Sequence, residues 1–328
     1  MNPGRRGLRL SVLAGTSLLA AASLARPYAR ALPPPDPRPV VRFLIGSPGG
    51  FNQHGFVAEY AKALPHISLT VVDSVRQGGG RIEEIQEGDA DMAVNLAHAA
   101  YLAFSGQMET APHRFDRLRA ISALGVVPVH LVARAGSGIR TVLDLRGRLV
   151  SMGAPRGEVS RLARSILAAY GVDFSSVRAA ANVPSEKAAA MLRAGTLDAM
   201  FVVGGYPAES VRTATAGGSS YLVPMEGAPA ERLRLDSRFF KVALIPPGTY
   251  QGQTTSIRTM GLQNILLVRR DLDEQVVYEL TKQFFAALPK LSLLVSSLRS
   301  MDLDQASATS IPLHEGAARY YRERELFR

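Results

Sequence analysis

The chain has 328 residues and contains neither cysteine nor tryptophan. Without cysteine the protein has no disulfide framework, no thiolate metal site and no cysteine nucleophile, and no thiol can carry the lipid of a bacterial lipoprotein. Its six histidines include no pair at the helical spacing of two metal ligands, and His314-Glu315 lacks the second histidine of the zinc-protease pattern. We therefore expect no metal site and no cofactor.

Motifs of enzymatic chemistry are missing as well. The chain contains no G-x-S-x-G nucleophile elbow, no G-x-G-x-x-G dinucleotide loop and no Walker phosphate loop. We expect that the protein is not an enzyme. An exported enzyme built from scattered residues is the alternative that this pattern leaves open.

Dense positive charge is also absent from most of the chain. Lysine and arginine number 38 against 28 aspartate and glutamate residues, a formal charge of +10. Five of the arginines lie in residues 1–31, which contain no acidic residue, so the remainder has 33 basic and 28 acidic residues and a formal charge of +5. Because no basic stripe interleaved with aromatic residues is present, we expect no nucleic-acid partner.

The N-terminal segment has the features of an export signal. Three arginines among the first nine residues precede an apolar run from Leu10 to Ala25 and an Ala-x-Ala sequence at 29–31. This pattern predicts a signal peptide over residues 1–31, cleaved near Ala31, and a periplasmic protein. A retained N-terminal anchor is the alternative, although the run is shorter than the roughly 20 residues of a membrane span. Residues 32–39 form a proline-rich linker.

The rest of the chain alternates apolar strand patterns with helical patterns, which is typical of an α/β fold. The predicted strands cover residues 40–45, 66–73, 90–95, 118–123, 129–134, 148–152, 197–203 and 262–268. The predicted helices cover residues 56–64, 81–87, 97–104, 160–170, 185–193 and 271–288, the last stopped by Pro289.

A strand followed by a glycine-containing turn and a helix occurs twice, at residues 40–64 and 148–170. Such a turn lets backbone N–H groups approach a ligand, and the helix N-terminus behind it favours negative charge. The repeat therefore predicts two similar lobes with a small, anionic solute between their turns. Turns whose glycines only satisfy backbone geometry are the alternative.

Four segments together resemble one known family. They are LRAI at 118–121 with VHLVAR at 129–134, DLRGRLVSMG at 144–153, IPPGTYQG at 245–252 and IPLHEGA at 311–317. The chain is similar over residues 40–328 to the TAXI group of extracytoplasmic solute receptors, which serve tripartite ATP-independent periplasmic (TRAP) transporters.

The resemblance implies a two-lobed, type II-like periplasmic binding fold. Each lobe would be a mixed sheet flanked by helices, with lobe one at 40–127 plus 258–328 and lobe two at 128–257. The receptor would close by a hinge on a small anionic or zwitterionic solute, such as an amino acid or dicarboxylate, and deliver it to a TRAP-type membrane permease without chemistry. A receptor that feeds a sensor or signalling partner is the alternative.

The same resemblance, combined with the turns, gives the candidate site residues. Lobe one would supply Ser47, Gly49, Gly50, Phe51, Asn52, Gln53, Gly78, Arg81, Asn95 and His98. Lobe two would supply Arg156, Gly157, Glu158, Gly204, Gly205, Tyr206 and Pro207.

The sequence departs from the family where hydroxyl donors for a carboxylate usually lie. Arg81 and Arg156 could replace those donors, since a guanidinium binds a carboxylate through two hydrogen bonds. Because the chain has many arginines, a surface or salt-bridged position is the favoured alternative for both. Asn95 would contact the ligand or pair with backbone. Glu158 would repel an anion unless it pairs with Arg156 or meets a ligand amine, and Tyr206 would cover the ligand or pack.

Overall fold

The computed structural model describes residues 38–46, 53–74, 81–237 and 239–326. The predicted signal peptide lies outside this range, and residues 37–328 form one compact unit. Within the described ranges, no helix is long and apolar enough to cross a membrane.

One ten-stranded mixed sheet organises the chain, in the order β2-β1-β3-β10-β4-β7-β5-β6, with β9 paired to β10 and β8 to β4. The first sheet half comprises β1 Val40–Ile45, β2 Ser68–Asp73 and β3 Met92–Leu96. The second sheet half comprises β5 Leu149–Ser151, β6 Arg178–Ala180, β7 Ala199–Val203, β8 Ser220–Val223 and β9 Phe240–Ile245.

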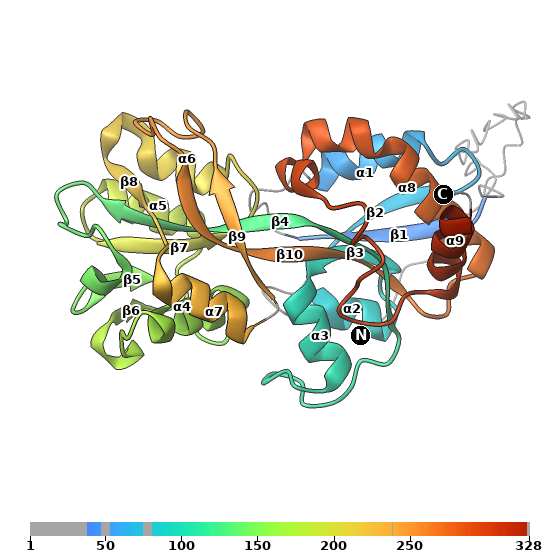
Figure 1. The fold of residues 1–328 in the computed structure, drawn as a ribbon, viewed down its shortest axis with the longest axis horizontal. Coiled ribbons are helices and arrows are strands. Elements are labelled where there is room, and N and C mark those ends of the chain that lie inside the picture. The colour runs from blue at the N-terminus through green and yellow to red at the C-terminus, as the bar shows by residue number, and fades with distance from the viewer. Residues whose placement is uncertain (1–37, 47–52, 75–80, 238, 327–328) are drawn as a thin grey trace, which may run out of the picture. The chain divides into compact units, whose positions relative to one another are not determined.

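Two long antiparallel strands connect these halves: β4 Leu118–Arg134 and β10 Ile257–Arg269. They run side by side between the two groups of elements (Figure 1). β10 pairs with β3 at one end and with β9 at the other, while β4 continues from β10 to β7 and β8. The predicted crossings near Val127 and Ile257 fall within β4 and at the start of β10, and the lobe boundaries themselves stay a prediction.

Helices flank both faces of the sheet. The first sheet half carries α1 Gln53–Lys62, α2 Arg81–Glu87, α3 Ala97–Ser105, α8 Glu274–Leu294, the 3₁₀ helix η5 Ser296–Ser300 and α9 Glu315–Leu326. The second carries α4 Glu158–Ala169, α5 Ser185–Arg193, α6 Glu209–Thr215 and α7 Ala228–Asp236, with short 3₁₀ turns η2 Val142–Leu145, η3 Phe174–Ser176 and η4 Ala216–Gly218.

Alternating side chains of the strands build a core on each face. In β10, Leu266 and Val268 join the apolar cluster under α1, α8 and α9, whereas Ile265 and Leu267 join the cluster above α2 and α3. The second half has the same arrangement, with one cluster under α4 and α7 and another under α5 and α6. Successive strand residues point to opposite faces, so both faces need covering helices. The predicted α/β fold of mixed strands flanked by helices is confirmed.

The prediction of separate strands at 118–123 and 129–134 is wrong, because β4 is continuous. Pro128, which lacks an N–H, lies where β4 changes partner from β10 to β7, so no ladder bond depends on that missing donor. Gly125 lies so close to η5 that an added Cβ would stand 1.5 Å from the carbonyl oxygen of Ser297. Gly125 and Pro128, which in the sequence suggest the end of a strand, are therefore both accommodated within β4.

The predicted stop of the long helix at Pro289 is also wrong, since α8 continues to Leu294. A proline in a helix removes only its own N–H donor, although its ring also crowds the preceding turn. The turn beyond it is held by tertiary packing, because Leu291 is fully buried in the core under α1 and α8. Burial of that turn therefore outweighs the local cost of the proline.

Candidate functional site

Several predicted site residues cannot be placed. Ser47, Gly49, Gly50, Phe51, Asn52 and Gly78 lie outside the described residues. Arg81 is the first residue of α2. The remaining predicted residues come from the end of β3, the starts of α1, α3 and α4, the turn before α4 and the turn after β7.

Gln53 and Asn95 both bind backbone of the first sheet half. Oε1 of Gln53, the first residue of α1, accepts a hydrogen bond from the N–H of Gly46 at 3.0 Å. Oδ1 of Asn95 accepts from the N–H of Leu96 at 2.8 Å. Of the two roles open to Asn95 from sequence, the structure shows backbone pairing. Both side chains thus fix the ends of strands that lead toward the site.

His98 and Glu158 meet across the two sheet halves. Nδ1 of His98, at the start of α3, donates to Oε1 of Glu158, the first residue of α4, at 3.0 Å. Nη2 of Arg161 donates to the other carboxylate oxygen at 2.7 Å. Burial raises the pKa of Glu158, but the hydrogen bonds and charges of His98 and Arg161 outweigh it and leave the pKa below its ordinary value. The carboxylate is therefore ionised and fully engaged.

This geometry decides one of the two alternatives left open for Glu158 from sequence. Glu158 does not pair with Arg156, which lies exposed in the turn before α4. Its true partner within the helix, Arg161, follows at the i+3 position, where side chains on a helix face one another. The i+3 spacing could have identified Arg161 as a partner from sequence. His98 lies 60 positions earlier, so its contact with Glu158 is visible only in the folded structure. Gly157 is the N-cap of α4.

The turn at residues 204–208 also reaches the first sheet half. The N–H of Gly204 donates to the carbonyl of Pro128 at 3.3 Å, and the N–H of Tyr206 donates to Oγ of Ser296 in η5 at 3.0 Å. Gly204 and Gly205 are buried, Pro207 is exposed, and the bond between Tyr206 and Pro207 is cis. Hydrogen bonds from Gly204 and Tyr206 therefore fix the turn to β4 and to η5.

A buried pair that sequence reasoning missed supports this turn. The hydroxyl of Tyr250 accepts from the N–H of Ala208 at 2.9 Å and lies 2.9 Å from Nε2 of His130. The hydroxyl and Nε2 share a hydrogen bond whose donor is set by the tautomer of the imidazole. Burial lowers the pKa of His130 to about 4. A histidine inside the apolar run of residues 129–133 was the available signal, because a buried imidazole needs a partner.

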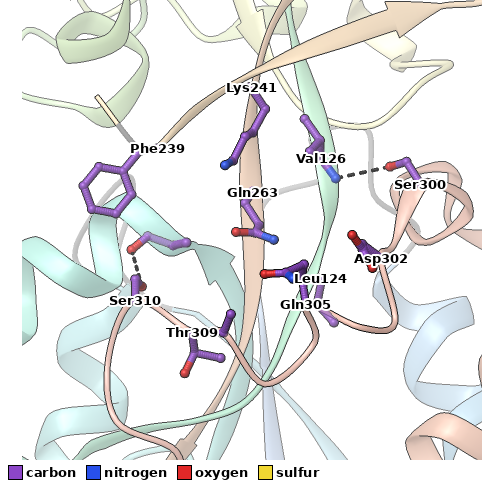
Figure 2. Close-up of a pocket in the computed structure, with 12 residues that line it drawn as sticks. Leu124, Val126, Phe239, Lys241, Gln263, Ser300, Asp302, Gln305, Thr309 and Ser310 are labelled. Atoms are coloured by element: carbon purple, nitrogen blue, oxygen red, sulfur yellow. Dashed lines mark hydrogen bonds between the residues drawn. The ribbon is translucent and has the colours of Figure 1, made fainter. Parts of the chain in front are cut away.

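A polar cavity lies beside the contact between His98 and Glu158. It has a volume of about 460 Å³, and we call it the hinge pocket because β4 and β10 contribute to its wall (Figure 2). Its lining includes Phe239, Lys241, Gln263, Asp302, Gln305 and Thr309. The Phe239 ring also packs against His98, with centroids 4.9 Å apart. None of the described residues predicted to bind solute lines this pocket.

The described ranges contain no cluster of three or more histidine, aspartate or glutamate residues placed to hold a metal ion. Near the junction of the sheet halves, the Glu158 carboxylate and the His98 imidazole bind each other, and the His130 imidazole is buried against Tyr250.

Solved structures share the fold at low sequence identity. MatC from Rhodopseudomonas palustris with bound malate matches with a TM-score of 0.53 and 14% identity, over 89% of this chain and 98% of that one. A protein of Bordetella bronchiseptica RB50 matches with a TM-score of 0.55 and 14% identity, over 88% and 98%. A protein described only as a periplasmic transporter matches with a TM-score of 0.55 and 11% identity, over 88% and 94%. This chain therefore shares its mixed α/β architecture with these three proteins.

A family comparison is more specific than these likenesses of fold. The profile of the NMT1-like family matches residues 63–324, which include β4, β10 and every described candidate residue except Gln53. The chain belongs to the NMT1-like family.

Proposed function

We propose that the protein is a periplasmic solute-binding receptor. It captures one small anionic or zwitterionic solute between the two sheet halves, closes by a hinge and delivers the solute to a TRAP-type membrane permease. The family and the shared fold support binding and transport, and the sequence resemblance to the TAXI group supports the permease type. Cell fractionation tests the location: the protein belongs in the periplasmic fraction, and retention in the cytoplasm would contradict it.

The contact between His98 and Glu158 carries this proposal. Residues predicted from opposite lobes come within 3.0 Å of each other, at the starts of α3 and α4. Only β4 and β10 are long enough to pass between the sheet halves among the described strands. Two connecting strands with a contact beyond them are the arrangement in which hinge closure brings two binding surfaces together.

The charges near that contact support an anionic or zwitterionic solute. Glu158 is engaged by His98 and Arg161, so its charge is balanced locally rather than by Arg156. Arg156 is exposed at the α4 N-terminus and is the side chain there that could receive a solute carboxylate. Isothermal titration of Arg156→Ala tests this assignment against Arg164→Ala, an arginine of α4 whose guanidinium lies over the Phe174 ring of η3. A loss of solute affinity in Arg156→Ala alone supports the assignment of Arg156, and equal affinities of the two variants contradict it.

The partner and the lack of chemistry are separate parts of the proposal. Solute uptake by proteoliposomes holding a TRAP permease, dependent on added receptor, would support delivery to that permease. Stimulation of a sensor kinase without uptake would favour the signalling alternative. A receptor also returns its solute unchanged, so chromatography of a bound solute after long incubation distinguishes it from an exported enzyme.

A further inference from the structure

The hinge pocket has donors that the fold does not use. Among the described residues, the Lys241 ammonium has no ion-pair partner, and the side-chain amides of Gln263 and Gln305 have no hydrogen-bond partner. Figure 2 shows these side chains directed into the same space. Lys241 and Gln305 are exposed and Gln263 is half-buried, so the observation that favours a ligand is the convergence of these three donors on one cavity.

The hydroxyls around the pocket are already committed to the fold. Oγ of Ser300 accepts from the N–H of Val126 and donates to the carbonyl of Ser297. Oγ of Ser310 donates to the carbonyl of Ala97, and Oγ1 of Thr309 donates to that of Ile311. The donors left for a ligand are therefore one cation and two amides, a set that suits a carboxylate.

The rest of the wall limits what can accompany that carboxylate. Leu124, Val126 and Phe239 provide apolar surface, and the Phe239 ring is held by His98 at 4.9 Å and by Tyr101 at 5.4 Å between centroids. Asp302 lies on the opposite side of the pocket from Phe239 (Figure 2). Its negative charge would repel a second anionic group.

We propose that the hinge pocket is a second binding site, for a small monocarboxylate with an apolar body. The carboxylate binds Lys241, Gln263 and Gln305, and the apolar body packs against Phe239. A volume of about 460 Å³ lies within the range of small-molecule pockets. Lys241 belongs to β9 of the second sheet half, while Asp302 and Gln305 follow η5 of the first. Occupancy therefore bridges the two halves and stabilises their present arrangement.

An NMR titration of the ¹⁵N-labelled full chain tests this site, with sodium benzoate as the probe and benzamide as its uncharged counterpart. We expect saturable shifts of the Lys241, Gln263 and Gln305 resonances with benzoate and binding of benzamide weaker by about tenfold. Phthalate, which adds a second carboxylate, should also bind more weakly than benzoate. Equal affinities for benzoate and benzamide, or no shift at these three residues, would overturn the proposal.

Two variants separate this pocket from the solute site. Lys241→Gln should lower benzoate affinity about tenfold, whereas Lys187→Gln, an exposed lysine on α5, should bind as the wild type does. An unchanged affinity in Lys241→Gln overturns the assignment. The amides of Gly157 and Gly204 report the solute site independently, so benzoate shifts confined to them overturn the second site while leaving the proposed receptor function intact.

Discussion

The hydroxyl of Tyr250 lies 2.9 Å from Nε2 of His130, and both side chains are buried. Tyr250 lies in the loop between β9 and β10, and His130 lies on β4, so the pair ties that loop to one of the two strands that connect the sheet halves. Because the same hydroxyl accepts from Ala208, it also fixes the turn whose Tyr206 N–H reaches Ser296. A hydrogen-bonded chain thus runs from β4 through the turn to the first sheet half.

Removal of this hydroxyl should loosen the turn. Tyr250→Phe leaves the N–H of Ala208 and Nε2 of His130 without their partner, so we expect a loss of about 1–3 kcal/mol of unfolding free energy. Amide exchange at Ala208 should become faster. Tyr321→Phe is the matched control, since its buried hydroxyl donates to the carbonyl of Ile121 instead. It should lose comparable stability without a change at Ala208, and unaltered exchange at Ala208 in Tyr250→Phe would contradict the role given to the hydroxyl.

His130 should make stability depend on pH between about 6.5 and about 4. Its pKa is lowered to about 4 by burial, from 6.5, so the unfolded chain binds the proton first as pH falls. The contribution of the neutral imidazole is complete above pH 6.5 and is lost as pH falls through this window, to a total of about 3 kcal/mol.

Denaturant unfolding of His130→Gln at several pH values measures that dependence. The unfolding free energy of the wild type minus that of the variant should fall as pH falls from 6.5 toward 4. This change does not depend on the absolute stability of the variant. His66→Gln, at an exposed position, should follow the wild-type profile. Parallel profiles for wild type and His130→Gln would show that His130 does not titrate in this way.

The pair of His98 and Glu158 should be coupled at neutral pH and uncoupled in acid. The pKa of Glu158 is held below its ordinary value of 4.5, so its contribution to stability is present above about pH 4.5 and is lost as pH falls through the lower folded-state pKa. A double-mutant cycle of His98→Gln and Glu158→Gln should give a coupling of about 0.5–3 kcal/mol at pH 7.

The exposed pair of Arg212 and Glu209 provides a comparison for that cycle, with side chains 60% and 73% exposed. Its coupling should be about 0–1 kcal/mol because solvent screens the charges. If the two cycles give the same coupling at pH 7, the contact between the sheet halves contributes no more than a surface ion pair.

Gly125 should be intolerant of any side chain. A Cβ there would stand 1.5 Å from the carbonyl oxygen of Ser297, so Gly125→Ala must displace η5 from β4. We expect a loss of more than about 3 kcal/mol by denaturant unfolding. Gly136→Ala is the comparison, since that residue has a φ of +76° but no heavy atom within 4 Å of an added Cβ. It should cost about 1 kcal/mol, for backbone conformation alone, and equal losses would rule out the close approach.

Local patterns predicted the elements that depend on local chemistry. The helices at 81–87 and 185–193 have the predicted bounds, because each has a periodic apolar face and a nearby glycine beyond its end. The break in β4 and the stop at Pro289 were predicted wrongly from the same local rules. In both places the deciding contact came from tertiary structure: a change of strand partner at Pro128 and the burial of Leu291.

The candidate site was predictable only in part for the same reason. The turns before α4 and after β7 could be recognised from glycine and proline. Two other contacts depend on how distant segments pack, and residue spacing gives no sign of them. They are the contact of Glu158 with His98 and the shared pocket of Lys241 and Gln305.

Thermal unfolding of the purified protein against amino acids, dicarboxylates, oxo acids and sugars tests the central claim most directly. A solute that binds only the folded state adds about 2.7 kcal/mol of stability at 100 times its Kd, so its melting temperature must rise. The account predicts such a rise with a small anionic or zwitterionic solute, reduced in Arg156→Ala. No rise with any member of the panel would contradict a receptor for such a solute.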